Sequence, residues 1–127
     1  QTQQMLRYSN DEFPKVVDYL YDHFDEFKLL FTSGENNAYQ EFIHRVVELD
    51  TGCTAQYIEA SGNDAVSSGR LTPELNHLLS SAFYTGMFEV VIHNMPKEQA
   101  MKHIQKMRRF YTAGWQTIFS SDGGEDC

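Results

Sequence analysis

The sequence predicts an all-α protein, an antiparallel bundle of about five helices in a single domain. Apolar residues recur at three- and four-residue steps over most of the 127 residues, which is the spacing of one buried helix face. Each of the three prolines, Pro14, Pro73 and Pro96, stands where a helix should begin, because N–H groups in a first helical turn have no intrahelical partner. The intervening segments are short and rich in residues that favour turns.

The first predicted helix is long and amphipathic, and it covers Asp11 to Thr32. Acidic residues occupy its outer faces, whereas its buried stripe is strongly aromatic. The stripe consists of Phe13, Val16, Val17, Leu20, Phe24, Phe27 and Phe31. The sequence Ser-Gly-Glu-Asn-Asn at residues 33–37 should end this helix.

The second predicted helix begins near Tyr39 and runs at least to Leu49. It reaches Ile58 only if the chain continues helically through Gly52, and the sequence leaves this open. Residues 60–69 are rich in Gly, Ser, Asn and Asp and should form a loop, the most mobile internal segment.

The last two predicted helices, Thr72–Asn94 and Pro96–Ser120, are one residue apart and should pack as an antiparallel hairpin. The Thr-Pro-Glu sequence at 72–74 supplies a hydroxyl cap, a proline and a carboxylate for the first turn. From Ala82 onward the first of these helices is apolar almost all round, so it must be covered on more than one side. One cover would be its own core, and the other could be a second copy of the chain.

Two glycines lie inside these helices, Gly86 and Gly114, where each costs about 1 kcal/mol relative to alanine. Close approach of another helix would compensate this cost, and Ala82 adds a second small residue on the face of Gly86. A glycine tolerated without any role is the open alternative.

The charge balance argues against a domain whose own surface binds nucleic acid. The chain has 18 acidic and 10 basic residues, a formal net charge of −8, whereas phosphate binding needs clustered Lys and Arg. All of this excess lies in residues 1–64, with twelve acidic and four basic residues. We interpret the basic residues of the last helix as a solvated outer face.

We expect a cytoplasmic, soluble protein without a membrane partner. No apolar run approaches the roughly 20 residues that span a bilayer, and the first residues lack the pattern of a signal peptide. Cys53 and Cys127 give neither a disulfide framework nor metal-ligand spacing, so we expect two free thiols. Residues 121–127 should form a disordered tail.

No motif of enzyme chemistry is present. The chain lacks the Gly-x-Ser-x-Gly motif of hydrolases and both the Gly-x-x-x-x-Gly-Lys and Gly-x-Gly-x-x-Gly motifs of nucleotide sites. We therefore expect a protein that is not an enzyme and that carries no cofactor.

A di-iron-like helical bundle is the alternative from another class, since it uses two Glu-x-x-His pairs and two further carboxylates. The candidate residues are Glu41, His44, Glu74, His77, Glu26 and Glu89. Both pairs point away from the apolar faces of their helices, whereas ligands in a bundle must project inward. The sequence therefore favours no metal site.

Three segments carry a family resemblance: residues 19–31 (YLYDHFDEFKLLF), residues 83–100 (FYTGMFEVVIHNMPKEQA) and residues 110–115 (FYTAGW). The chain from Gln1 to Phe119 resembles the C-terminal domain of TetR/AcrR-type transcriptional regulators from Gram-positive bacteria. The resemblance implies an effector-binding and dimerisation domain over residues 1–120, preceded by a helix-turn-helix domain that is not in this sequence. Residues 1–10 would be the end of the connecting helix.

The resemblance also implies a homodimer that binds DNA only through the preceding domain. In the family the last two helices pair with their symmetry mates as a four-helix bundle, which agrees with the apolar segment after Ala82 and spaces two DNA-reading heads. The residues expected at this interface are Ala82, Gly86, Val90, Phe110, Gly114 and Ile118.

The implied mechanism is a two-state switch driven by a small apolar or amphipathic effector. The effector would enter between the long aromatic helix, the helix starting near Tyr39 and the inner face of the Thr72–Asn94 helix. Its differential affinity for two settings of the connector, typically ~1–3 kcal/mol, would be the regulatory energy. The residues expected to line the pocket are Phe24, Phe27, Phe42, Val46, Tyr57, Phe83 and Met87. A dimerisation module without a ligand is a third possibility, which lacks a cavity.

Overall fold

The structure is a computed structural model that describes residues 13–120. Within these residues the chain forms helices and no strand, which confirms the predicted all-α class. A helical segment at residues 13–22 comes first, followed by α2 (Phe24–Thr32), the short 3-10 helix η1 (Glu35–Asn37), α3 (Ala38–Ser61), α4 (Pro73–Ile92) and α5 (Lys97–Phe119).

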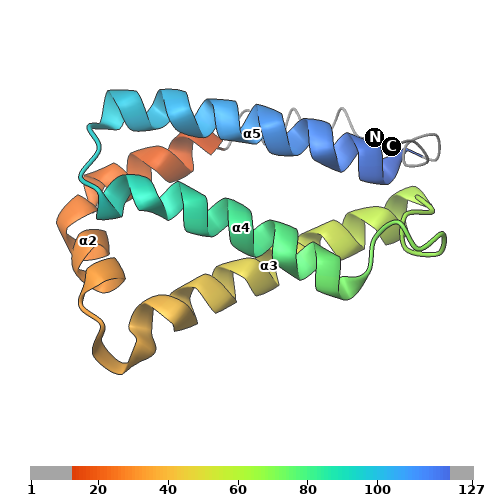
Figure 1. Ribbon diagram of the computed structural model, residues 1–127, viewed down its shortest axis with the longest axis horizontal. Coiled ribbons are helices and arrows are strands. Elements are labelled where there is room, and N and C mark those ends of the chain that lie inside the picture. Colours follow the sequence, from red (N-terminus) through yellow and green to blue (C-terminus); the bar gives the residue numbers. More distant parts are fainter. Residues whose placement is uncertain (1–12, 121–127) are drawn as a thin grey trace.

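Helix α4 is the central element of the bundle. It packs against α2, α3 and α5, with α5 antiparallel beside it and α3 crossing it at an angle (Figure 1). These neighbours bury Met87, Phe88, Val90 and Val91. The chain itself therefore supplies the cover for much of the apolar segment after Ala82.

The predicted hairpin of the last two helices is confirmed, with its turn at residues 93–96. Asn94 adopts the left-handed conformation with φ 58°, and the N–H of Met95 donates to the carbonyl of Val90 at 2.9 Å. Pro96 precedes the first residue of α5 and its carbonyl accepts the N–H of Ala100 at 2.9 Å.

The predicted single helix over Asp11–Thr32 is wrong at His23, where φ −119° and ψ 38° interrupt the helix. The sequence has neither Pro nor Gly at this position. Tertiary contacts hold both sides of the break against the α4–α5 turn: the Tyr21 hydroxyl donates to the carbonyl of Met95 at 2.7 Å, and Lys28 Nζ donates to the carbonyl of Ile92 at 2.6 Å. The two segments therefore bend around the end of α4 instead of running straight.

Helix α3 settles the question left open at Gly52, because it continues through this glycine to Ser61. It ends at Gly62, which has φ 72°, a conformation that glycine adopts without steric cost. The N–H of Asn63 donates back to the carbonyl of Ile58 at 3.2 Å and satisfies one of the last carbonyls of the helix.

The predicted start of α4 is confirmed by its cap. Thr72 Oγ1 accepts the N–H of Leu75 at 3.0 Å, and Pro73 occupies the first helical position. The predicted loop before this cap lies at residues 62–72, and it closes on itself through the N–H of Leu71, which donates to the carbonyl of Ala65 at 2.9 Å.

Two groups of buried and half-buried residues hold the bundle together. The aromatic core consists of Phe27, Phe31, Phe42 and Phe88, whose rings lie with centroids 4.9 to 6.0 Å apart where they pair. The loop-end core consists of Ile58, Ala65, Leu71 and Phe119. The two cores lie toward opposite ends of α3.

Several predictions fall on other parts of the chain. The connector at residues 1–10, the tail at residues 121–127 and Cys127 lie outside the described residues. Cys53 is an exposed free thiol. None of the described helices combines the length and apolarity needed to cross a membrane.

Candidate functional site

A cavity of about 170 Å³ lies between α3, α4 and α5, and the sequence predicts a pocket elsewhere. A space of about 150 Å³ is enough for a benzene ring. The lining residues are Phe13, Asp50, Thr54, Leu79, Ser80, Phe83, Tyr84, Arg108, Tyr111, Thr112, Trp115, Gln116 and Phe119. The wall is therefore aromatic, with polar groups from all three helices.

A polar seam runs between α3 and α4 along this wall, formed by Asp50, Thr54, Asn76 and Ser80. Thr54, Asn76 and Ser80 are 4%, 7% and 2% exposed, so each lies in the protein interior. Ser80 Oγ donates to Asp50 Oδ2 at 2.6 Å, and Thr54 Oγ1 donates to the carbonyl of Asp50 at 3.2 Å. Buried polar groups usually need such partners because dehydration without one is costly.

Asn76 is only partly satisfied within the polar seam. Its Nδ2 donates to the carbonyl of Thr51 at 3.3 Å, whereas its Oδ1 has no hydrogen-bond partner in the part of the chain that the structure describes. The polar seam thus places a buried hydrogen-bond acceptor without a partner between α3 and α4, and other residues of the seam line the cavity.

Asp50 and Tyr84 form the most perturbed titratable pair of the cavity. Burial raises the pKa of Asp50, while hydrogen bonds from Ser80 and Tyr84 favour the carboxylate and oppose this shift. Burial, followed by the charge of Asp50, raises the pKa of Tyr84, so the tyrosine stays protonated and donates. A partly buried carboxylate with a raised pKa in a cavity is typical of a functional position.

Arg108 supplies positive charge to the cavity wall from α5. Its guanidinium carbon lies 4.5 Å from the centre of the Phe13 ring, which is cation–π geometry. Burial lowers the pKa of Arg108. Because Phe13 also lines the cavity, this contact links the helical segment at residues 13–22 to the site.

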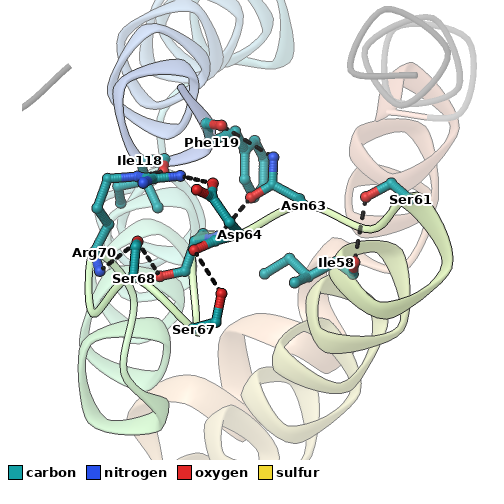
Figure 2. Close-up of polar contacts among 10 residues, drawn as sticks. Ile58, Ser61, Asn63, Asp64, Ser67, Ser68, Arg70, Ile118 and Phe119 are labelled. Carbon is teal, nitrogen blue, oxygen red and sulfur yellow. Dashed lines mark hydrogen bonds and ion pairs between the residues drawn. The ribbon is translucent and has the colours of Figure 1, made fainter. Parts of the chain in front are cut away.

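At the loop end of the bundle a hydrogen-bonded clamp, formed by Asn63, Asp64 and Arg70, holds the end of α5 (Figure 2). Asn63 Nδ2 donates to the carbonyl of Phe119 at 3.0 Å, and Arg70 Nε donates to the carbonyl of Ile118 at 2.8 Å. Arg70 also pairs with Asp64, which lowers the pKa of that carboxyl. The clamp satisfies the last carbonyls of α5 and fixes Phe119, whose side chain forms part of the cavity wall.

Of the seven residues predicted to bind an effector, Phe83 lines this cavity and the other six do not. Phe27 and Phe42 belong to the aromatic core, and Phe24 and Met87 pack with the same group of buried residues. Val46 is half-buried on α3, and Tyr57 packs on Phe119 with ring centroids 5.3 Å apart. At the predicted location between the N-terminal aromatic helices and α4, these side chains pack against one another and against the buried core.

The six residues predicted at a dimer interface occupy different surroundings. Val90 is 4% exposed in the single chain and belongs to its buried core. A Cβ on Gly86 would meet Met107 Cε of the same chain at 3.0 Å, so this glycine allows close packing of α5. Ile118 is half-buried, whereas Ala82, Phe110 and Gly114 are exposed.

The alternative metal centre finds no convergent ligands. Among residues 13–120, no group of three or more His, Cys, Asp and Glu side chains could hold a metal ion. Glu41, His44, Glu74 and His77 are exposed. Three histidines lie near single carboxylates three or four residues away: His44 lies 3.4 Å from Glu48, His93 2.7 Å from Glu89 and His23 3.7 Å from Glu26.

Sequence reasoning missed most of the site, although one signal was available. Asp50 and Thr54 follow the buried Val47 by three and seven residues, so they occupy buried stripe positions. Asn76 and Ser80 likewise precede the buried Met87 by eleven and seven residues, close to whole numbers of helical turns. Polar residues at buried stripe positions were the signal, and Arg108, four residues after the buried Ile104, carries it as well.

Comparison with known proteins leaves the site to be interpreted from its own geometry. No family model matches the chain, and no curated protein or solved structure matches it either.

Proposed function

We propose that this chain is the effector-sensing and dimerisation domain of a cytoplasmic regulator of the TetR/AcrR type. In this proposal a small amphipathic molecule binds the cavity between α3, α4 and α5, and a homodimer passes the signal to a helix-turn-helix domain that precedes residue 1. The domain itself performs no reaction.

One observation carries the sensing part of the proposal: an aromatic cavity lies beside a buried polar seam. Small-molecule sites are concave and mostly apolar, with a few polar groups that fix the orientation of the ligand. Asp50, Ser80 and Tyr84 are such groups, and Phe83, Tyr111 and Trp115 are apolar wall residues. The cavity favours a sensor over a dimerisation module without a ligand.

A physical route from the cavity to the N-terminal side supports regulation by the ligand. Phe13 lines the cavity and stacks on Arg108, and it begins the described part of the helical segment at residues 13–22. A ligand that needs different positions of these two side chains favours one setting of that segment. Coupling of this kind is typically worth ~1–3 kcal/mol.

Tryptophan fluorescence tests the sensing part directly, because Trp115 is the only tryptophan of the chain and lines the cavity. A neutral aromatic probe, 2-phenylethanol, should change the fluorescence of Trp115 saturably and raise the melting temperature. In Thr112→Phe the added ring occupies the cavity, so we expect about tenfold weaker binding, a loss of ~1.4 kcal/mol.

Thr32→Phe is the matched control, since it makes the same substitution at an exposed position on α2. Its probe affinity should equal that of the wild type. Equal affinity of the Thr112→Phe and Thr32→Phe variants, or no saturable change in the wild type, would count against a ligand site in this cavity.

Exposed small and apolar residues beside the α4–α5 contact support the dimerisation part. Gly86 meets Met107 at that contact, and residues three or four positions away lie next to it on each helix. These neighbours are Ala82 and Phe110, and Phe110 is 75% exposed. Gly114 continues the same stripe of α5, so a second copy of the chain could approach closely here.

Sedimentation equilibrium of Phe110→Asp tests this surface. The wild type should be a dimer and the variant a monomer, because a carboxylate in an apolar interface is dehydrated without a partner. Leu49→Asp on α3 is the control, since Leu49 is also exposed at 73%. A dimer that persists in Phe110→Asp contradicts the proposed interface.

The gene sequence upstream of residue 1 tests the family assignment. A basic helix-turn-helix unit of roughly 45–60 residues there would agree with a dimeric reader of two half-sites. An upstream sequence without such a unit would contradict the family assignment, whereas the ligand site would still be tested by Trp115 fluorescence.

A further inference from the structure

The two charged groups of the cavity lie at different levels of the bundle. Asp50 receives its hydrogen bond from Ser80, whereas Arg108 follows Met107, which lies opposite Gly86. Six residues of α4 separate Ser80 from Gly86, about 9 Å at the ordinary helical rise. The cavity therefore has an anionic end at Asp50 and a cationic end at Arg108.

The Asp50 carboxylate retains capacity for a further donor. A carboxylate offers about four lone-pair sites, and Ser80 and Tyr84 donate to it as neutral hydroxyls. No ion pair joins Asp50 to a Lys, Arg or His within the described ranges. Its negative charge is thus solvated by two hydroxyls and faces a cavity without a cationic partner of its own.

Aromatic rings line the cavity that the Asp50 carboxylate also lines. Phe83, Tyr84, Tyr111 and Trp115 all contribute to the wall, and the faces of such rings attract cations. The stacking of Arg108 on Phe13 is an example of this attraction in the same cavity. A cation placed near Asp50 would gain from both the carboxylate and the rings.

Burial of Asp50 also favours a cationic ligand. Burial raises the pKa of this carboxyl, so the free protein holds the charged form at a cost. A positive charge beside the carboxylate offsets that cost, whereas a neutral hydroxyl offsets less of it and an anion adds to it.

We propose that the cavity selects small aromatic amines in their protonated form, with the ammonium group donating to Asp50 and the aromatic group lying among the rings of Phe83, Tyr111 and Trp115. This inference rests on the proposed effector site and names its ligand class. The volume of about 170 Å³ fits one benzene-sized ring.

Three probes of similar shape and different charge test the ligand class: 2-phenylethylamine, 2-phenylethanol and 3-phenylpropanoate. Their dissociation constants come from Trp115 fluorescence of the full chain at neutral pH. We expect the amine to bind about tenfold tighter than the alcohol, and the carboxylate to bind weakest. This comparison uses the wild type alone, so it does not depend on the folding of a variant.

Asp50→Asn then identifies the group responsible. The substitution keeps the shape of the side chain and removes its charge, so amine affinity should fall about tenfold while alcohol affinity stays within about twofold. Asp25→Asn is the matched control, because Asp25 is exposed on α2 and its loss changes the net charge equally. The control should bind all three probes like the wild type.

The outcomes separate the ligand class from the site itself. If the wild type binds the alcohol or the carboxylate as tightly as the amine, the amine class is overturned and the proposed effector cavity stands. If Asp50→Asn keeps full amine affinity, Asp50 is not the recognition group and the inference fails. If none of the probes changes the fluorescence of Trp115, both the class and the proposed site are overturned.

Discussion

Helices α3 and α4 contact each other in two different ways along their length. At one end Phe42 of α3 packs on Phe88 of α4, with ring centroids 5.5 Å apart. Eight residues along each helix, about 12 Å at the helical rise, Asp50 of α3 accepts a hydrogen bond from Ser80 of α4 at 2.6 Å. The aromatic core excludes water with large side chains, whereas the polar seam has short ones and borders a cavity.

This difference indicates which part of the α3–α4 contact stabilises the fold and which part is available for binding. Rings in mutual contact gain dispersion and burial energy, and removing one leaves a void. The polar seam carries a buried carboxylate, which contributes little stability and provides a group for recognition. The two ends of the α3–α4 contact should therefore respond to substitution in different ways.

The largest effect should come from the aromatic core. Phe88→Ala removes a side chain that is 3% exposed and that contacts Phe31 and Phe42, so the free energy of unfolding should fall by about 3–5 kcal/mol. Urea denaturation measures this loss. Leu49→Ala, at an exposed position of α3, should change the same quantity by less than about 0.5 kcal/mol. Similar losses in both variants would remove the distinction between core and surface.

A smaller effect is expected where the clamp holds the end of α5. Arg70→Ala removes a hydrogen bond from a charged group to the carbonyl of Ile118, so unfolding should cost about 1.5–3 kcal/mol less. Asp64→Asn keeps that hydrogen bond and loses the exposed ion pair, so its destabilisation should be the smaller of the two. A larger effect of Asp64→Asn would mean that the ion pair, and not the carbonyl cap, fixes the end of α5.

Two glycines sharpen the comparison at the level of backbone packing. Gly52→Ala should raise the free energy of unfolding by about 0.5–1 kcal/mol, because nothing lies within 4 Å of the added Cβ and alanine favours the helix. Gly86→Ala should gain less, since its Cβ would lie 3.0 Å from the Cε of Met107, a flexible side chain that can shift. Thermal unfolding at matched concentration compares them, and a greater gain at Gly86 would contradict the close contact.

The smallest effect is a pH dependence at the polar seam. Because the folded pKa of Asp50 is raised above its ordinary value of about 3.9, its contribution to stability is fully present below that pH and is lost as the pH rises through the folded pKa. Asp50→Asn does not ionise, so its stability relative to the wild type should increase over this window and then stay level.

Ser80→Ala provides the internal check on this pH dependence. It removes a hydrogen bond that favours the carboxylate, so the folded pKa of Asp50 should rise further. The pH window in which stability falls should therefore extend to higher pH. Denaturation curves of the three proteins between about pH 3 and 8 measure these changes. A stability difference between the wild type and Asp50→Asn that does not vary with pH would mean that burial leaves this carboxyl unperturbed.

Local sequence signals predicted the helices well where the cause was itself local. Thr72 caps α4 and residues 33–37 end α2 as expected, because capping and left-handed turns depend on the residue at that position. The break at His23 was not predictable in this way. It follows from contacts of Tyr21 and Lys28 with residues more than 60 positions away.

The candidate site was harder to predict than the fold. Helical periodicity identifies an apolar stripe, but it does not say whether a ring such as Phe42 packs on another ring or lines a cavity. The structure assigns Phe42 to the aromatic core and Phe83 to the cavity wall. The outcome depends on how far apart α3 and α4 lie at each level, and no local pattern encodes that separation.

Side-chain contacts restrain α5 at both of its ends. At its start, Lys97 pairs with Asp18 at 2.7 Å, and at its finish Asn63 and Arg70 bind its last carbonyls. The cavity lies along the span between these contacts. Because both ends of α5 are held, the helix cannot readily move outward as a rigid body. We expect a ligand larger than the cavity to bend or rotate the middle of α5. Such a displacement would be greatest in the middle of α5 and would strain the contacts at both of its ends.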